Sequence, residues 1–199
     1  MDRETTQIRG REQFRKYKKL ISLIVSLYRV FPTKTRIKLL ERHRYMRGRI
    51  GIGIRYALLK SLAKSCGDNV GIGQGVYIVN PQFLSVGDNV SIHPMSYIDC
   101  GFNAENGLVI GSNVSIAHGS TIMDSTHSFQ DLDTNIKDQP MLTIKTEICD
   151  NVWIGAKATI IAGNTVNRGC IVAAGAVVTK STEEDCIYAG VPATIIKRR

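Results

Sequence analysis

The chain has 199 residues, of which 43% are hydrophobic and 22% charged, values that suit a globular protein with one sizeable domain and a modest appendage. Its five cysteines are an odd number without CxxC spacing, which argues against a disulfide framework or a zinc ribbon and fits a reducing cytoplasm. The net charge of +9 is uneven, because residues 1–64 hold 18 Lys or Arg against 4 Asp or Glu, whereas residues 65–199 hold 8 against 13. A basic arm on a mildly acidic body suggests an anionic partner for the arm, although solvated basic helices are also common.

The first part of the chain, residues 1–64, is predicted to be a basic helical segment. Its apolar run, LISLIVSLYRVF at residues 20–31, is too short to span a bilayer and lacks a small-residue cleavage site. Ser22, Ser26 and Arg29 recur at helical spacing and leave a wide apolar face on the rest of the helix. That face either lies in a membrane interface or packs on the protein's own body or a partner subunit. We therefore expect a cytoplasmic protein, with peripheral contact between residues 1–40 and the inner face of the cytoplasmic membrane as one alternative, and no nucleic-acid partner.

From Cys66 onward, an aliphatic residue recurs every six positions. The beat pauses for twenty residues directly after His127 and resumes at Ile148, and fourteen of its sixteen positions are Ile or Val. Six is a multiple of the strand period of two, and β-branched residues favour strands, so each unit is predicted to be a short strand followed by a corner. Turn-forming triplets such as GDN at 67–69 and GSN at 111–113 supply the corners. Three such units close a triangular coil.

This repeat resembles that of the hexapeptide-repeat acyltransferases, whose fold is a left-handed parallel β-helix. Four blocks look like the signatures of the sugar O-acetyltransferase branch, which includes galactoside and maltose acetyltransferases and enzymes that modify capsule and O-antigen: DSTHSFQD (124–131), ICDNVWIGAKATIIAGNTV (148–166), GCIVAAGAVVTKS (169–181) and YAGVPATIIKRR (188–199). The resemblance covers roughly residues 65–199. It implies a mainly β fold with an N-terminal helical segment, one long excursion loop at 128–147, and a homotrimer with its active sites between subunits.

The resemblance also implies the chemistry. A saccharide hydroxyl would attack the thioester of acetyl-CoA directly, with His127 as general base and no acyl-enzyme. Asp124 precedes that histidine by three residues and is a candidate for orienting its ring. A loop that leaves immediately after the histidine can fold over it and exclude water. No metal is expected.

Six residues are expected to line the acetyl-CoA site by the same resemblance. Ala156 and Ala174 lie eighteen residues apart, hence in one corner column on successive coils, where small side chains leave room for the pantetheine arm. The others are Trp153, Thr179, Lys180 and Lys197. Where relatives often carry a basic residue, this chain has Thr194. Arg198 could replace that residue in contacts with the coenzyme A phosphates.

For the acceptor, Asp99 and Glu105 occupy positions where relatives carry sugar-binding polar groups. The outward residues Tyr77, Tyr97, Trp153 and Ile171 are predicted to share one face, as a subunit interface, a ligand groove or a surface covered by the chain's own helices.

Three other functions remain compatible with the sequence. The first is an acetyltransferase for a small acceptor such as an antibiotic or serine. The second is a γ-carbonic-anhydrase-like metalloenzyme, which would need His93, His118 and His127 to converge on zinc. The third is a non-enzymatic hexapeptide scaffold.

Overall fold

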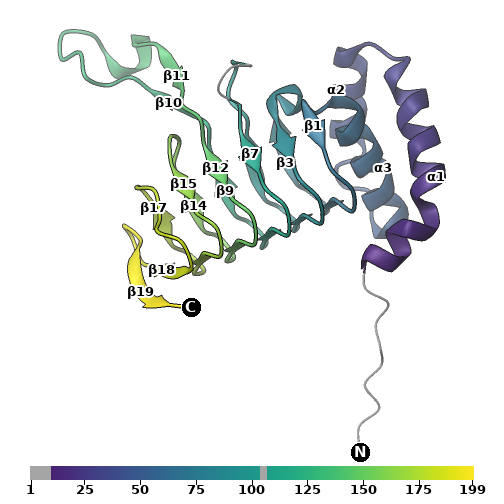
Figure 1. Cartoon of the computed structure of the whole chain (residues 1–199). Coiled ribbons are helices and arrows are strands. Elements are labelled where there is room, and N and C mark those ends of the chain that lie inside the picture. Colours follow the sequence, from purple (N-terminus) through teal and green to yellow (C-terminus); the bar gives the residue numbers. More distant parts are fainter. Residues whose placement is uncertain (1–9, 104–106) are drawn as a thin grey trace, which may run out of the picture.

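Three helices and a parallel β-helix make up the computed structural model, which describes residues 10–103 and 107–199 (Figure 1). The helices are α1 (Gly10–Arg29), α2 (Thr33–Arg42) and α3 (Gly48–Leu62). Helix α3 lies against the first coil of the β-helix, and both α1 and α2 pack on α3. The predicted fold class, mainly β with a parallel β-helix, N-terminal helices and one long excursion, is confirmed.

The β-helix has three parallel sheets, one for each side of the coil. Sheet A contains β1 (Ser65–Cys66), β4 (Ser85–Val86), β7 (Val109–Ile110), β12 (Glu147–Ile148) and β15 (Thr165–Val166). Sheet B contains β2 (Gly71–Ile72), β5 (Ser91–Ile92), β8 (Ser115–Ile116), β13 (Trp153–Ile154), β16 (Ile171–Val172), β18 (Cys186–Ala189) and the antiparallel β19 (Thr194–Arg198). Sheet C contains β3 (Tyr77–Val79), β6 (Tyr97–Asp99), β9 (Thr121–Ile122), β14 (Thr159–Ile160) and β17 (Val177–Val178). Short 3-10 helices occupy Pro81–Phe83 and Ile136–Asp138.

The six-residue beat fills the core, as predicted. Thirteen of its sixteen positions are buried; Cys66 and Ile78 are partly buried, and Ala104 lies outside the described residues. The apolar residues two positions before them are buried too, among them Val90, Ala158 and Ala176. Each coil therefore points two side chains inward per strand, which explains why β-branched residues of nearly constant size recur.

Asparagines make one of the corner columns. Asn69, Asn89, Asn113 and Asn151 all have φ between 56° and 60°, a left-handed conformation that Asn tolerates better than most residues. The Nδ2 of Asn69 donates to the Oδ1 of Asn89 at 2.9 Å, and Asn89 donates to Asn113 in the same way at 2.9 Å. The GDN and GSN triplets are therefore corners, as the sequence predicted.

The predicted assignment of outward residues to faces is wrong across one coil. Tyr77 and Tyr97 are paired neighbours in sheet C, whereas Trp153 pairs with Ser115 and Ile171 in sheet B. The strand order gives the cause: β6 lies in sheet C and the next strand, β7, lies beside β4 in sheet A, so the hexad counted between them takes no side of the triangle and every later unit is displaced by one side. The aromatic strip predicted for a single face is thus divided between two sheets.

Arg55 ties the helices to the β-helix. Its side chain is 1% exposed and donates to the backbone oxygens of Ile72, His43 and Met46. Burial lowers the pKa of this guanidinium. Tyr56 and Leu59, on the same helix, belong to the hydrophobic core of the β-helix. The boundary predicted between residues 64 and 65 falls between α3 and β1 and stays a prediction, because this core runs across it.

Two glycines of α3 provide a matched test of this packing. A Cβ at Gly51 would overlap the carbonyl oxygen of Met46, whereas a Cβ at Gly53 would meet nothing within 4 Å. We expect Gly53→Ala to raise the free energy of unfolding by about 0.5–1 kcal/mol, since alanine is the better helix former. Gly51→Ala should instead lower it by about 1–3 kcal/mol through overpacking. Chemical denaturation of both variants checks this, and equal effects would contradict the close packing of α3 on the 43–46 segment.

Candidate active site

His127 lies in the stem of a hairpin that leaves the β-helix. Strand β10 (Ser125–His127) pairs antiparallel with β11 (Met141–Thr143), and His127 is opposite Met141. The chain leaves the coil after β9 and rejoins it at β12, so the predicted long excursion is present, but it begins before the histidine and not directly after it. The place in sheet A that the six-residue register offers to His127 is taken by Glu147, which pairs with Val109 and Thr165.

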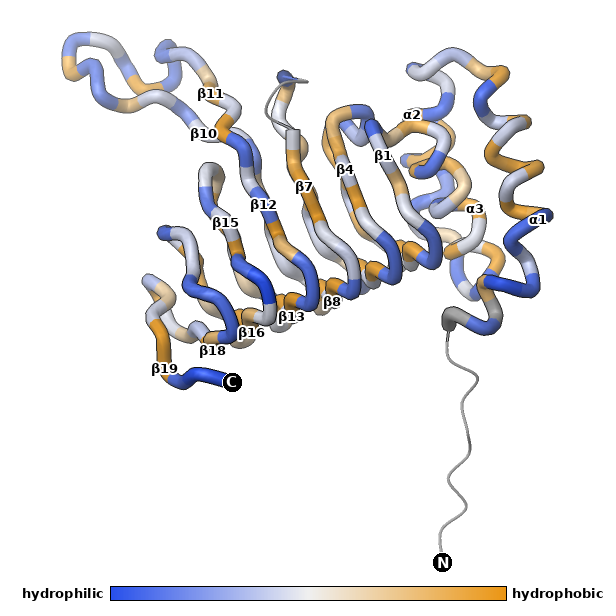
Figure 2. The backbone as a smooth tube through the Cα atoms, in the orientation of Figure 1, coloured by the Kyte–Doolittle hydropathy of each residue, from blue (hydrophilic) through white to orange (hydrophobic). Residues whose placement is uncertain are grey.

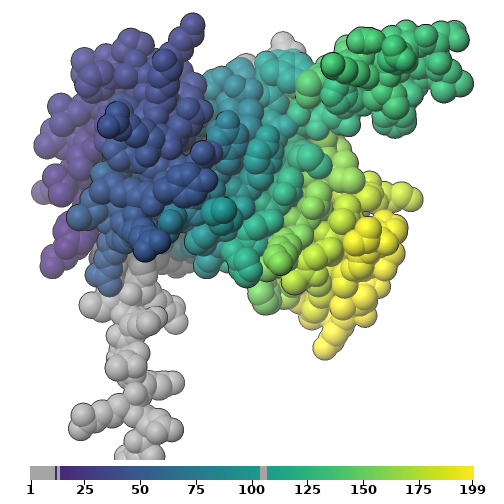
Figure 3. Space-filling view, turned by 180° about the vertical axis from the view of Figure 1, so that it is seen from behind, coloured from purple at the N-terminus to yellow at the C-terminus, as the bar shows by residue number. Residues whose placement is uncertain are grey.

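The excursion projects away from the body of the β-helix (Figures 1 and 3). The side chain of His127 is exposed in the single chain, as the predicted outward orientation requires, but the water exclusion expected from the loop is not provided within one copy. The projecting segment is rich in exposed apolar side chains: Phe129, Leu132, Ile136, Met141, Leu142 and Ile144. A buried Gln139 orders it from within by donating to the backbone oxygens of Asp131 and Thr134.

Asp124 is buried at the foot of the hairpin. Its Oδ1 accepts from the backbone N–H of Thr146 at 2.8 Å, and its own backbone oxygen accepts from the N–H of Ile144 at 2.9 Å. Its Oδ2 has no hydrogen-bond partner among the described residues. Burial is the main cause that raises its pKa to about 7, and the charge of Asp99 adds to the shift. No hydrogen bond joins Asp124 to His127 in the described part of the chain, so the carboxyl holds the two ends of the excursion together instead of touching the ring.

Asp99, the predicted acceptor residue, lies at the same corner. Its Oδ2 accepts a short hydrogen bond from the hydroxyl of Ser125, and its Oδ1 accepts from the N–H of Gly101 at 3.0 Å. Asp99 thus contacts the strand that carries His127, two residues before the histidine. Glu105, the second predicted acceptor residue, lies outside the described residues.

Ser125 and Thr146 are the site residues that sequence reasoning missed. Each is a common polar residue next to a turn, and only the pairing of the hairpin stem reveals its partner. One signal could have found Ser125. It follows β9 at the corner where Asp99 ends β6, and β6 and β9 are neighbours in sheet C.

The predicted acetyl-CoA residues fall into two groups. Ala156 and Ala174 stack in one corner column between sheets B and C, where the N–H of Gly175 donates to the oxygen of Ala156 at 2.8 Å. The coils approach closely there, because a Cβ at Gly155 would lie 2.5 Å from the backbone N of Ala174. Trp153, 53% exposed, stands on the adjoining side in sheet B. Lys197 is exposed on β19, which closes the same sheet.

Thr179 and Lys180 belong to the other group. They follow β17 at the corner between sheets C and A, the corner that also carries Asp99 and the foot of the hairpin. Both are exposed. Within one copy, sheet C therefore separates His127, Thr179 and Lys180 from Trp153, Ala156 and Ala174.

The histidines divide in the same way. His93 and His118 lie at the corner between sheets B and C, whereas His127 lies beyond the opposite edge of sheet C. In the ranges 10–103 and 107–199, no three His, Cys, Asp or Glu side chains converge as metal ligands would. The γ-carbonic-anhydrase-like alternative therefore gains no support from the geometry.

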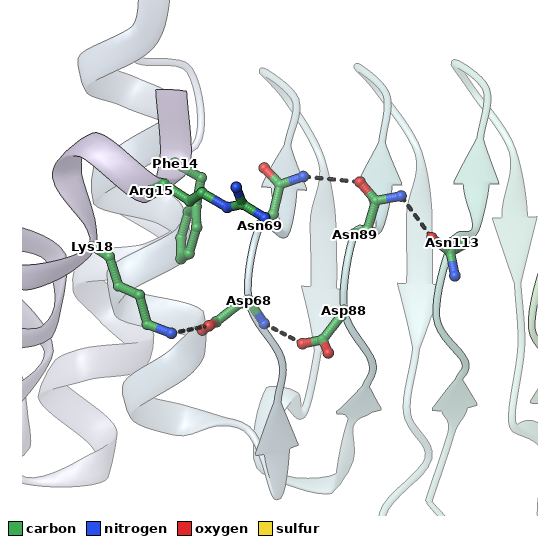
Figure 4. A pocket seen from close by; sticks show the side chains of 8 residues that line it. All are labelled: Phe14, Arg15, Lys18, Asp68, Asn69, Asp88, Asn89 and Asn113. Atoms are coloured by element: carbon green, nitrogen blue, oxygen red, sulfur yellow. Dashed lines mark hydrogen bonds and ion pairs between the residues drawn. The ribbon is translucent and has the colours of Figure 1, made fainter. Parts of the chain in front are cut away.

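A pocket of the described chain lies away from these residues. It has a volume of about 340 Å³ and lies between α1 and the first coils, lined by Phe14, Arg15, Lys18, Asp68, Asn69, Asp88, Asn89 and Asn113 (Figure 4). Its floor is the asparagine corner column, and none of the predicted site residues lines it.

Comparison with known proteins identifies the family. No family model matches the chain. A protein of Mycobacterium tuberculosis named as an acetyltransferase is 31% identical over 173 residues, which cover 82% of this chain and 55% of that protein. Galactoside O-acetyltransferase of Escherichia coli is 28% identical over 128 residues, 63% of this chain and 62% of the enzyme. A protein of Saccharomyces cerevisiae named as an acetyltransferase is 30% identical over 144 residues, 71% of this chain and 69% of that protein. The chain thus spans between about half and two thirds of the length of these relatives.

Solved structures agree with this relationship. The maltose O-acetyltransferase of Clostridium difficile superposes with a TM-score of 0.71 at 25% identity, over 81% of this chain and 83% of that one. A galactoside acetyltransferase in complex with coenzyme A gives a TM-score of 0.72 at 25% identity, over 83% of this chain and 80% of that one. Together with the six-residue repeat and the triangular coil, these similarities show that the chain belongs to the hexapeptide-repeat acetyltransferases of the galactoside and maltose O-acetyltransferase type.

Proposed function

We propose that this protein transfers an acetyl group from acetyl-CoA to a hydroxyl of a saccharide, in a bacterial surface polysaccharide or its precursor. The observation that carries the proposal is the exposed His127 in the hairpin stem. Two residues before it on the same strand, the hydroxyl of Ser125 donates to the carboxylate of Asp99. Relatives named as galactoside and maltose O-acetyltransferases, and the coenzyme A bound in one solved neighbour, support the reaction class.

The active unit in this proposal is a homotrimer with its sites between copies. Within one copy the two groups of predicted residues lie on opposite edges of sheet C, so a second copy is needed to bring a coenzyme column next to His127. The projecting hairpin, with Leu132 95% exposed, has the apolar surface that such a contact would bury. Docking of the hairpin on a neighbouring copy would also exclude water from the histidine.

The chemistry follows from these positions. Neutral His127 accepts the proton of the acceptor hydroxyl while the oxygen attacks the thioester carbonyl. The new C–O bond forms, the C–S bond breaks, and the imidazolium returns the proton to the departing thiolate of coenzyme A. Asp99, fixed by Ser125 and Gly101, holds a hydroxyl of the sugar next to the histidine. Tyr97, 41% exposed and two residues before Asp99 on the same outward side of β6, offers an apolar ring face to the sugar.

For the donor, Ala156 and Ala174 leave space along a corner for the pantetheine arm, and Trp153 flanks it. Lys180 and Lys197 meet its phosphates as point charges, together with Thr179. We propose Asp124 as a residue that positions His127, because it binds Thr146 across the foot of the hairpin.

Incubation with acetyl-CoA and a panel of mono- and oligosaccharides, followed by mass spectrometry, tests the proposal. We expect a mass increase of one acetyl group on at least one saccharide. Serine and an aminoglycoside in the same panel cover the small-acceptor alternative. Failure to bind coenzyme A by calorimetry would instead favour a non-enzymatic scaffold.

A further inference from the structure

Helix α1 has two apolar sides, and only one of them is used inside the molecule. Phe14, Ile21 and Val25 pack toward α3 and the core. The second side, together with two residues that follow the helix, consists of exposed residues that we name the outer stripe: Leu20, Leu23 and Leu27 in α1, and Val30 and Phe31 after its end at Arg29. The spacing of three and four places the leucines along one side of the helix, at the end of the molecule farthest from β19 (Figure 2).

The orientation of the outer stripe is fixed by contacts on the opposite side of α1. Lys18 forms an ion pair with Asp68 at 2.6 Å, and Lys60 of α3 binds the other oxygen of the same carboxylate at 2.7 Å (Figure 4). These two ammonium groups lower the pKa of Asp68. The ring of Phe14 meets that of Tyr56 edge-on at 5.7 Å. Because these contacts prevent α1 from rolling, the stripe remains outward.

Cations accompany the outer stripe. Residues 10–64 contain 16 Lys or Arg and only 2 Asp or Glu. Lys16 precedes Leu20 by four residues and Lys19 precedes Leu23 by four, so both lie beside the stripe. Both are exposed, and neither forms an ion pair with the described residues.

We propose that the outer stripe binds the surface of an anionic phospholipid membrane, with α1 lying in the interface plane. The apolar side chains would enter the boundary between headgroups and acyl chains, while Lys16 and Lys19 meet the lipid phosphates. A second copy is the less suitable occupant, because packing two such stripes together would bring their lysines face to face. No helix in the described part of the chain is long and apolar enough to cross a bilayer. Residues 1–9 of the predicted membrane segment 1–40 lie outside the described residues.

Vesicle binding by the full-length protein tests this inference. The probes are vesicles of phosphatidylcholine alone and of phosphatidylcholine mixed with phosphatidylglycerol, and the measurement is co-sedimentation at low and high salt. We expect binding to the anionic vesicles that weakens with salt. The double variant Leu23→Gln/Leu27→Gln should reduce the partition coefficient about tenfold or more. Lys16→Gln/Lys19→Gln should reduce it about twentyfold at low salt, with little effect at high salt.

Leu132→Gln is the control, because it makes the same change at an even more exposed leucine, in the β10–β11 excursion. It should leave vesicle binding unchanged. All substituted residues are exposed, and circular dichroism checks that each variant is folded.

Absence of binding to anionic vesicles, or equal binding by Leu23→Gln/Leu27→Gln, overturns the inference. So does a change in oligomeric mass of that variant without a change in vesicle binding, since the stripe would then be a contact between copies. Acetyl transfer to a water-soluble saccharide should be unaffected by the stripe variants, so this inference and the proposed reaction fail separately.

Discussion

Replacing His127 with alanine is expected to lower kcat/KM for acetyl transfer by about a hundredfold to ten-thousandfold, the usual contribution of a general base. Without the imidazole, the acceptor hydroxyl keeps its proton and remains a weak nucleophile. His127→Asn should be similarly inactive, because an amide forms hydrogen bonds but does not accept the proton. Initial rates with saturating acetyl-CoA measure the effect.

Two controls separate this loss from structural damage. The side chain of His127 is exposed and makes no hydrogen bond to the described residues, so the thermal midpoint and the oligomeric mass should not change. Coenzyme A affinity by calorimetry should stay within about twofold, since a base acts on the acceptor hydroxyl. Full activity of His127→Ala would sink the proposed mechanism.

The second large effect concerns the pH dependence of stability. Burial raises the pKa of Asp124 to about 7 from its ordinary value of 3.8 in the unfolded chain. Between about pH 4 and pH 7 the unfolded chain releases this proton while the folded protein retains it, so the free energy of unfolding falls as pH rises. This contribution is fully present below about pH 4 and is lost once the folded carboxyl ionises near pH 7. Its size is on the order of 2–4 kcal/mol.

Asp124→Asn should remove this pH-dependent component. The amide oxygen still accepts from the N–H of Thr146, and no charge is buried. We expect the variant to exceed the wild type in unfolding free energy at pH 8 by on the order of 2–4 kcal/mol, and to match it near pH 4. Urea denaturation at both pH values measures the difference. A variant with unchanged stability but much reduced transfer would instead restore Asp124 as the residue that orients the histidine ring.

Most of the fold was predictable because one physical constraint repeats. Every coil must point aliphatic side chains into a narrow triangular core, so the spacing of residues such as Ile92, Ile98 and Ile154 reports the strands directly. The corner asparagines add a second signal, since their left-handed conformation restricts the choice of residue. The excursion was visible as the place where both signals stop.

What the sequence did not predict depends on register and on long-range pairing. The strands run from β6 in sheet C directly to β7 in sheet A, so the hexad counted between them takes no side of the triangle, and counting residues assigned Trp153 to the wrong face. The partners of Asp124 were hidden for a related reason: Thr146 lies twenty-two residues later, on the far side of the excursion. The separation of the predicted donor residues by sheet C followed only once the order of strands was known.

The first coil has no coil before it, and helix α3 takes that place. Helix α3 supplies Tyr56, Leu59 and the guanidinium of Arg55 to the end of the β-helix. A polypeptide that began at residue 65 would leave the terminal strands with unpaired amides above an open aliphatic lumen. Two such ends would meet head to head, so the shortened protein would be prone to associate in pairs through its exposed first coil. The helical arm therefore caps the first coil and protects its exposed strands from pairing with another copy, whatever else the arm binds.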